Sequence, residues 1–289
     1  MHRIGIIGGS GLYEIEGIKD VERVEVETPF GRPSDAFTLG KLVGREVVFL
    51  PRHGSGHTLS PSALPFRANI YGMKKLGVEQ IIAVSAVGSM KEEIRPLDIV
   101  IPDQFFDRTK GRQETFFGEG IVAHVSFADP VCSAIGEALY RATKELKVRV
   151  HKGGTYICME GPQFSTRAES LVYRQLGVSV IGMTNLQEAK LAREAEICYA
   201  TLALATDYDC WHVGEEEVTA QMVIDNLKKN VETAKKIIKV AIPELPKVRQ
   251  CKCATALENA IVTRPDVIPA KKKKELELII GKYLPVGKG

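Results

Sequence analysis

The apolar run Ile197-Cys-Tyr-Ala-Thr-Leu-Ala-Leu-Ala205 leads directly into Thr206-Asp-Tyr-Asp-Cys-Trp211. Small, aliphatic and β-branched residues dominate the run, which predicts a strand buried on both faces. Side chains two residues apart in an extended segment point the same way, so Asp207 and Asp209 should leave the strand side by side. Because open α/β sheets bind ligands at the carboxyl ends of their strands, the pair is a candidate binding site.

Two other interpretations fit this aspartate pair. An Asp after a strand is most often a turn former or the N-cap of the next helix, and the local sequence alone favours a turn. Asp-x-Asp also occurs in hard-cation sites, but these need further oxygen ligands, and no Asp-x-Asp-x-Asp-Gly loop follows. The choice between the interpretations therefore depends on the rest of the chain.

The composition is typical of a soluble globular protein. The chain has 289 residues, of which 44% are apolar and 26% charged, with a net charge of +3. This balance does not favour nucleic-acid binding, and no apolar run reaches the roughly 18 residues of a transmembrane helix. The apolar run near Met1 is too short for a signal peptide, so we expect a cytoplasmic protein without membrane contact. The late run Lys271–Lys274 is interpreted as a solvated helix face, with a polyanion-binding patch as the second choice.

The six cysteines are too sparse for a disulfide scaffold. Cys251 and Cys253 form a C-x-C pair in a polar segment, where we expect free thiols, with a strained and redox-labile bridge as the alternative. A zinc site would need two more nearby ligands, and no residue has suitable spacing, so no metal site is predicted. The other four lie in or beside apolar segments and are predicted core thiols: Cys132, Cys158, Cys198 and Cys210.

Strand-like runs alternate with helix-like ones, which predicts an α/β fold with a central mixed, twisted sheet flanked by helices. No clear boundary divides residues 1–289, so a single domain is expected. The segment 104–120 is interpreted as a long functional loop. The predicted strands are 3–7, 36–42, 47–50, 80–86, 98–102, 154–159, 179–182 and 197–206. The predicted helices are 60–76, 128–146, 166–176, 186–195, 219–240 and 270–284.

Four further strand ends carry small or polar residues. Gly8-Gly9-Ser10-Gly11 lets backbone N–H groups approach an anion, and Arg52-His53 is a donor pair suited to phosphate. Each motif alone has a plain alternative, such as a tight turn or a surface Arg. Together they fit one phosphate bound without a metal, through Ser10, Arg52, His53, Ser85, the Ala86 N–H and Thr184.

The longest distinctive stretch is Met159-Glu-Gly-Pro-Gln-Phe-Ser-Thr-Arg-Ala-Glu-Ser170. Thr166 and Glu169 have the spacing of a capping box, which gives them a structural role at a helix start. Phe164 falls at the tip of the predicted turn, where its ring could stack on a planar base; a core Phe is the alternative.

With these residues assembled, the chain resembles the trimeric branch of the purine nucleoside phosphorylase family. The resemblance runs from Ile4 to about Pro243 and is closest to the members that cleave 5′-methylthioadenosine. A divergent helical segment, about 250–289, lies beyond it. The matching segments are 8–11, 28–35, 52–54, 99–109, 160–165, 167–170 and 205–211.

The resemblance implies phosphorolysis of a nucleoside N-glycosidic bond, with phosphate as co-substrate and no cofactor or metal. Asp207 and Asp209 would bind the purine edge, while Phe164 and Ser165 would border the base. Met183 would hold the ribose through its backbone, although Gly182 stands where relatives have Asn. The 5′ pocket, which would accept a methylthio group, would be lined by His124, Ala220 and Val223. Relatives complete their pockets from a neighbouring subunit, so a trimer or a dimer of trimers is expected.

The aspartate pair also predicts the choice of base. The leaving purine needs a proton at N7, and Asp207 is the candidate donor if burial beside Asp209 raises its pKa well above about 3.9. A carboxylate accepts from the amine of adenine but faces the oxygen of a 6-oxopurine unfavourably. A 6-oxopurine or methylthioinosine phosphorylase is the first alternative; a nucleoside hydrolase or a non-catalytic nucleoside-binding protein is less favoured.

Overall fold

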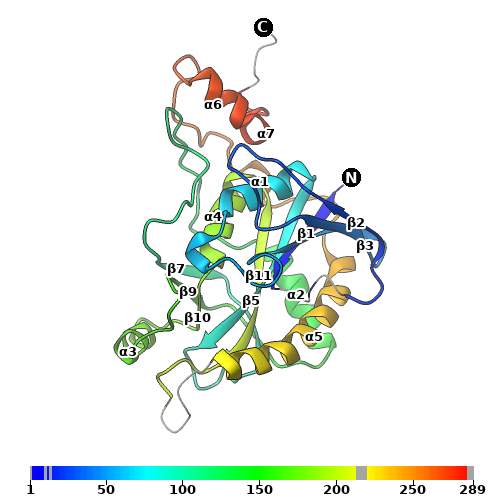
Figure 1. The fold of residues 1–289 in the computed structure, drawn as a ribbon, viewed down its shortest axis with the longest axis vertical. Helices are drawn as coiled ribbons and strands as arrows, with labels where there is room; N and C mark the ends of the chain where they lie inside the picture. Colours follow the sequence, from blue (N-terminus) through cyan, green and yellow to red (C-terminus); the bar gives the residue numbers. More distant parts are fainter. Residues whose placement is uncertain (1, 10–11, 13–14, 213–219, 285–289) are drawn as a thin grey trace.

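The strands form one mixed sheet that runs through the centre of the molecule (Figure 1). The computed structural model describes residues 2–9, 12, 15–212 and 220–284. Its strands are β1 (Arg3–Gly8), β2 (Lys19–Val24), β3 (Phe37–Leu42), β4 (Arg45–Pro51), β5 (Val78–Ser89), β6 (Ile99–Ile101), β7 (Gln104–Arg108), β8 (Val150–Lys152), β9 (Thr155–Met159), β10 (Val180–Gly182) and β11 (Cys198–Asp207).

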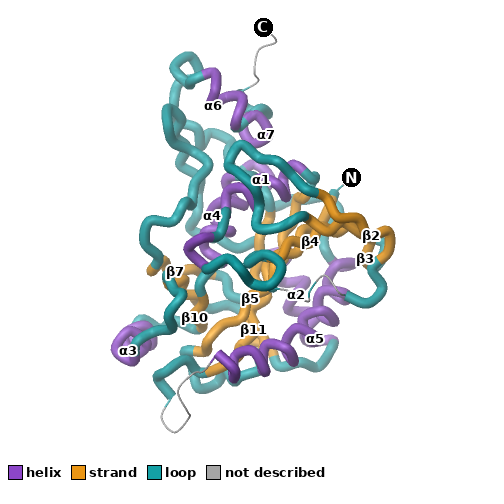
Figure 2. The backbone as a smooth tube through the Cα atoms, viewed as in Figure 1, coloured by secondary structure: helices purple, strands orange, loops and turns teal. Residues whose placement is uncertain are grey.

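The helices cover both faces of this sheet. The α-helices are α1 (Phe66–Lys75), α2 (Ser133–Glu145), α3 (Arg167–Gln175), α4 (Asn185–Glu194), α5 (Ala220–Glu244), α6 (Ala270–Glu275) and α7 (Glu277–Ile280), with 3-10 turns η1 (Pro61–Ala63) and η2 (Lys252–Thr255). Helices α1 and α4 pack on one side of the strands and α2 and α5 on the other (Figure 2). Along β11, Tyr199 faces the first layer and Ala200 the second, as the two-residue period of a strand requires.

Parallel pairing aligns the strand ends that matter for the site. The order across the sheet is β2-β3-β4-β1-β5-β10-β9-β7, and β11 pairs with β5 and β6. β1 runs parallel to β4 and β5, and β11 runs parallel to β5. The carboxyl ends of β1, β4, β5 and β11 therefore meet at one edge, which confirms the predicted α/β fold. All ten residues of β11 are buried, as its apolar sequence predicts.

Some predicted elements have different bounds. The segment 104–120 is not a loop throughout, because its first residues form the edge strand β7 beside β9. Strands β2 and β8 were also missed: β2 is almost fully exposed and β8 has three residues, so neither shows a buried strand's pattern. The predicted helix 60–76 divides at Pro65 into η1 and α1, since a residue preceding proline avoids the helical region.

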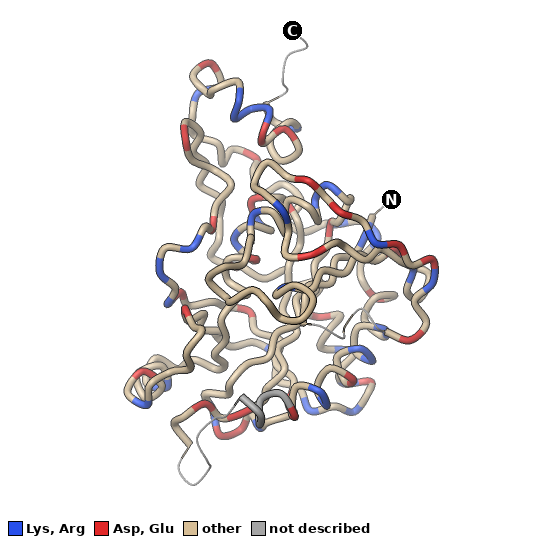
Figure 3. Tube along the Cα trace, viewed as in Figure 1, with Lys and Arg blue, Asp and Glu red and all other residues tan. Residues whose placement is uncertain are grey.

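The outer parts of the structure carry most of the charge. Figure 3 shows acidic and basic residues interspersed along the chain, with the lysine run of 271–274 on α6. Lys272 pairs with Glu119 and Glu275, whereas Lys271 is exposed, so the run is at least partly a solvated, ion-paired face. Among the described helices, none is long and apolar enough to span a bilayer.

Candidate active site

The two aspartates lie at the carboxyl end of β11. Asp207 is the last residue of the strand, and Asp209 follows with a φ of 55°, in the left-handed region. The Asp209 N–H donates to Asp207 Oδ1 at 2.8 Å, and the Thr206 hydroxyl donates to Asp207 Oδ2 at 2.7 Å. An Asp that accepts from the N–H two residues on forms an Asx turn, so the turn interpretation is confirmed. The expectation that extended backbone pairs the two side chains is wrong, because the turn brings them together.

This turn is buried, unlike most turns. Asp207 is 6% and Asp209 9% exposed. Both pack against Gly88 of β5, where a Cβ atom would lie 3.0 Å from Asp207 Oδ1 and 3.4 Å from Asp209 Cβ. Burial raises the pKa of Asp209; the Ser170 hydroxyl opposes this rise, and the charge of Asp207 adds to it. A carboxyl group that keeps its proton to higher pH suits proton transfer to a substrate.

The turn before α3 reaches the same place. The Ser165 hydroxyl donates to Met159 Sδ at 3.6 Å, and the Ser165 carbonyl accepts from Cys210 Sγ, next to Asp209, at 3.4 Å. The predicted capping box at Thr166 and Glu169 is present and starts α3. Phe164 is 47% exposed, so it is a surface residue and not a core Phe. Its ring is accessible for stacking beside Ser165.

Arg52 follows β4 and is buried in an ion pair with Glu188 of α4. Arg52 Nε and Nη2 donate to Glu188 Oε1 and Oε2 at 2.5 and 3.0 Å, and Nη1 donates to Val84 O at 2.8 Å. The Tyr199 hydroxyl also donates to Glu188, at 2.9 Å. Among the described contacts, this leaves one N–H on each terminal nitrogen of the guanidinium for a ligand. The sequence analysis did not predict Glu188 as the partner of Arg52. The sequence around Glu188 indicates only an acidic residue in the first turn of a helix.

His53, next to Arg52, has a defined tautomer. Its Nδ1 lies 2.8 Å from the Leu59 carbonyl, which can only accept, so Nδ1 carries the proton. Burial lowers the pKa of His53 to about 4, despite the Leu59 hydrogen bond, and the charges of Arg52 and His57 lower it further. The ring is therefore neutral near pH 7, and Nε2 is an acceptor.

The Tyr156 hydroxyl joins two more of the predicted phosphate residues. Ser85 Oγ lies 3.3 Å from the Tyr156 hydroxyl, whose pKa is raised by burial and is lowered slightly by the Thr184 backbone. Gly182 makes room for this hydroxyl, because a Cβ atom there would lie 1.9 Å from it. Thr184 is the N-cap of α4. A helix N-terminus beside two hydroxyl side chains is suited to binding an anion.

Arg112 is a positioning residue that the sequence analysis missed. Its side chain is 2% exposed and donates from Nη1 to the Met183 carbonyl at 2.5 Å. Nη2 donates to the Glu160 carbonyl, and Nε pairs with the Glu160 carboxylate at 3.3 Å. Arg112 thus holds Met183 against the strand end that carries Glu160. An isolated Arg in a polar loop gives no sequence signal for such a role.

The remaining predicted residues are Ala86, Ser10, Ala220, Val223 and His124, and of these Ala86 accepts at its carbonyl from the Ser85 hydroxyl at 3.2 Å. Ala86 lies within β5, in register with Leu204 of β11. Ser10 is outside the described residues, as are the side chains of Ala220 and Val223 at the start of α5. His124 is exposed and its N–H donates to the Ala260 carbonyl at 2.8 Å. No contact among the described residues joins His124 to the aspartates.

The arrangement places a buried carboxyl pair and a group of hydroxyl and guanidinium donors at the ends of adjacent strands. β5 carries both Gly88, against the aspartates, and Ser85, beside Tyr156. A family model described as the phosphorylase superfamily matches residues 3–243. The chain belongs to the phosphorylase superfamily.

Close relatives within the phosphorylase superfamily share nearly the whole chain. An S-methyl-5′-thioadenosine phosphorylase of Koribacter versatilis is 61% identical over 280 residues, which cover 97% of this chain and 96% of the relative. One of Geobacter sulfurreducens is 61% identical over 282 residues, covering 97% and 99%. The similarity extends past the superfamily match and so includes the C-terminal segment that the sequence analysis considered divergent.

Solved phosphorylase structures agree with the fold. A methylthioadenosine phosphorylase from an antarctic soil metagenomic library superposes with a TM-score of 0.91 at 51% identity, covering 96% of this chain and 98% of that one. The Schistosoma mansoni methylthioadenosine phosphorylase in complex with adenine superposes with a TM-score of 0.84 at 35% identity, covering 89% and 96%.

Proposed function

We propose that this protein cleaves 5′-methylthioadenosine with inorganic phosphate, giving adenine and 5-methylthioribose 1-phosphate. The observation that carries the proposal is the buried pair of Asp207 and Asp209, packed on Gly88 of the strand that also carries Ser85. The names of the relatives at 61% identity support the same substrate. The absence of a cofactor and a cytoplasmic location stay predictions from the sequence.

Phosphate is proposed to bind where Arg52, His53, Ser85 and Thr184 come together, with Ser10 and the Ala86 N–H as further donors. Arg52 supplies the two N–H groups that its bonds to Glu188 and Val84 leave over. The bare Nε2 of His53 can accept a hydrogen bond from a phosphate oxygen that carries a proton. Phosphate held in this way faces the ribose carbon, where it stabilises positive charge and then forms the new C–O bond.

The aspartate pair is proposed to serve the leaving purine. When the N-glycosidic bond breaks, its electrons go to the purine, which then needs a proton at N7. Asp207 is the proposed donor, and Asp209 accepts from the exocyclic amine. The two carboxyl groups are proposed to titrate as a coupled unit, because the charge of Asp207 helps to raise the pKa of Asp209. Burial and the Asp207 charge let the pair keep one proton to a higher pH than a free Asp does.

The ribose and 5′ contacts complete the substrate site. Met183, whose carbonyl is held by Arg112, is proposed to line the ribose, and Phe164 with Ser165 to border the base. His124, Ala220 and Val223 are proposed to line the 5′ pocket. Because His124 is exposed and no described contact joins it to the aspartates, we propose that it acts on the site of a neighbouring subunit.

An exposed apolar face supports a homo-oligomer, proposed as a trimer or a dimer of trimers. Phe106 of the edge strand β7 and Val172 and Leu176 at α3 line one shallow hollow. They are 41, 51 and 56% exposed, respectively. Neighbouring apolar side chains on an edge strand are typical of a surface that another chain covers. Native mass spectrometry of the wild type and of Leu176→Glu tests this: the variant should form smaller assemblies.

The experiment that tests the function uses two nucleosides. The protein is incubated with 5′-methylthioadenosine or 5′-methylthioinosine, with and without phosphate, and the released base and sugar are identified. Adenine and 5-methylthioribose 1-phosphate, formed only with phosphate, are the expected products. Release without phosphate would indicate a hydrolase, and release of hypoxanthine alone would indicate a 6-oxopurine phosphorylase. No release from either nucleoside would indicate a binding protein.

A further inference from the structure

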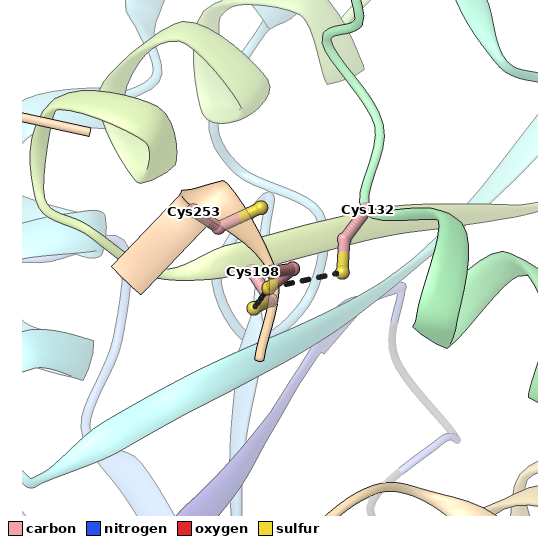
Figure 4. A group of neighbouring side chains, drawn as sticks. Cys132, Cys198 and Cys253 are labelled. Atoms are coloured by element: carbon pink, nitrogen blue, oxygen red, sulfur yellow. Dashed lines mark hydrogen bonds between the residues drawn. The ribbon is translucent and has the colours of Figure 1, made fainter. Parts of the chain in front are cut away.

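Four cysteines from three parts of the chain meet at the amino end of β11. Cys198 is the first residue of the strand, Cys132 is the N-cap of α2, and Cys251 and Cys253 flank the start of η2. Their Sγ atoms all lie within 4.8 Å of one another. Cys251 Sγ is 3.2 Å from Cys198 Sγ and 3.9 Å from Cys132 Sγ, and all six cysteines of the chain are free thiols. Figure 4 shows the side chains of Cys132, Cys198 and Cys253 turned toward a common centre.

The fold brings two further cysteines to the C-x-C pair, which the spacing of the cysteines in the sequence did not reveal. The two further ligands for the C-x-C pair are Cys132 and Cys198, which are distant in sequence and close in space. In a tetrahedral zinc site with Zn–S bonds of about 2.3 Å, neighbouring sulfurs lie about 3.8 Å apart. Sulfurs that all lie within 4.8 Å of one another therefore need to move by about 1 Å or less to surround one ion.

The surroundings can stabilise thiolates and admit an ion. Cys132 is the N-cap of α2, where the positive end of the helix dipole favours a thiolate. Beside the cluster is a hollow lined by Cys132, Cys198 and Cys251 together with Arg249, which pairs with Glu79 at 2.9 Å. Cys132, Cys198 and Cys253 are buried, and Cys251 is half-buried on the side of this hollow.

We propose that Cys132, Cys198, Cys251 and Cys253 bind one Zn²⁺ through their sulfurs and release the thiol protons to solvent. The bound ion links the segment that follows α5 to the amino end of β11. The same junction is already held by Arg249, which donates to the Glu196 carbonyl at 2.5 Å, and by Gln80, which donates to the Pro246 carbonyl at 3.0 Å. Four thiolates select a soft tetrahedral ion, and in a reducing compartment such cysteines bind metal more often than they pair.

Metal analysis of the full chain tests the proposal. The protein is made without a histidine tag and purified under reducing conditions, and its metal content is measured by inductively coupled plasma mass spectrometry. About one zinc per chain is expected. Cys251→Ser and Cys253→Ser should lose most of it, whereas Cys210→Ser, which changes a cysteine outside the cluster, should keep it. Cys251 is half-buried, so its replacement is the variant most certain to fold.

Cobalt provides a second readout that does not depend on activity. Wild-type protein stripped with a chelator and loaded with Co²⁺ should show the visible absorption and the sulfur-to-metal charge-transfer bands of a tetrahedral tetrathiolate site, and Cys251→Ser should not. Wild-type protein without metal, in which mass spectrometry finds the four cysteines joined in disulfides, would overturn the site. Zinc retained by both Cys251→Ser and Cys253→Ser would overturn it as well, and iron in place of zinc would contradict the choice of ion.

Discussion

The two ends of β11 carry different chemistry and are assembled differently. At the carboxyl end, Asp207 and Asp209 are neighbours in sequence, and one tight turn sets their geometry. At the amino end, Cys198 meets cysteines from α2 and from the chain after α5. At the carboxyl end, the two carboxyl groups are the proposed contacts of a substrate. At the amino end, the four thiols lie within 4.8 Å of one another. One strand thus places a buried carboxyl pair at one end, where we propose catalysis, and four thiols at the other, where we propose metal binding.

Removal of the catalytic carboxyl group should give the largest effect. Asp207→Ala removes the proposed N7 donor, and kcat/KM for 5′-methylthioadenosine should fall by about 10³-fold, within the range for loss of a general acid. The exposed Asp266 offers a matched control, since Asp266→Ala should keep wild-type kinetics. The metal content of both variants should equal that of the wild type. A fall of metal content in Asp207→Ala would contradict the independence of the two ends.

Variants of the buried ion pair between Arg52 and Glu188 distinguish a structural role of Arg52 from a role in phosphate binding. Glu188→Gln and Arg52→Lys both disrupt the paired geometry, and each should lower the free energy of unfolding by about 3 kcal/mol, as measured by urea denaturation. Only Arg52→Lys also loses the proposed phosphate donors, so only this variant should raise the KM for phosphate, by about tenfold or more. Equal KM values for phosphate in the two variants would show that Arg52 has a structural role alone.

The lowered pKa of His53 predicts how the free energy of unfolding depends on pH. Its pKa is lowered from 6.5 to about 4 in the folded protein, so the unfolded chain binds the proton first as pH falls. The contribution of neutral His53 to the free energy of unfolding is therefore fully present above pH 6.5. It is lost as the pH falls from 6.5 to 4, which lowers the free energy of unfolding by up to about 3 kcal/mol. Urea denaturation of wild type and His53→Gln across this range checks it, because other titrating groups cancel in the difference. A difference that does not change with pH would contradict the neutral His53.

A smaller effect is expected where a glycine lets β5 approach the aspartates. Gly88→Ala places a Cβ atom 3.0 Å from Asp207 Oδ1, so the carboxyl group must shift and kcat should fall by about tenfold. Gly136→Ala in α2 is the control: its Cβ would meet only Ile101, at 3.6 Å, and alanine favours a helix. This control should keep kcat and gain up to about 1 kcal/mol of stability. An unchanged kcat in Gly88→Ala would weaken the placement of Asp207 at the reacting atoms.

Features formed by residues adjacent in the chain could be predicted from the sequence. It predicted the eight strands with buried apolar patterns, the capping box at Thr166, and the aspartate pair. It missed β2 and β7 because exposed edge strands carry polar residues on both faces. It also missed Glu188 and Arg112, and it did not find that Cys132 and Cys198 lie beside Cys251 and Cys253. The partners of these residues come from distant segments, which only the tertiary fold brings into contact.

The most direct test of the proposed catalytic edge is a change of base preference. The ratio of kcat/KM for 5′-methylthioadenosine to that for 5′-methylthioinosine is measured in the wild type and in Asp207→Asn. Asp207 is proposed to donate to N7, which neighbours the 6-position of the purine. In the variant, the Asn side chain can donate to N7 and also to the oxygen of a 6-oxopurine beside it, whereas the wild-type carboxyl pair presents an acceptor to the amine of adenine there. We predict that the ratio strongly favours methylthioadenosine in the wild type and falls by about 10²-fold or more in the variant. An unchanged ratio would contradict the assignment of Asp207 to the purine edge.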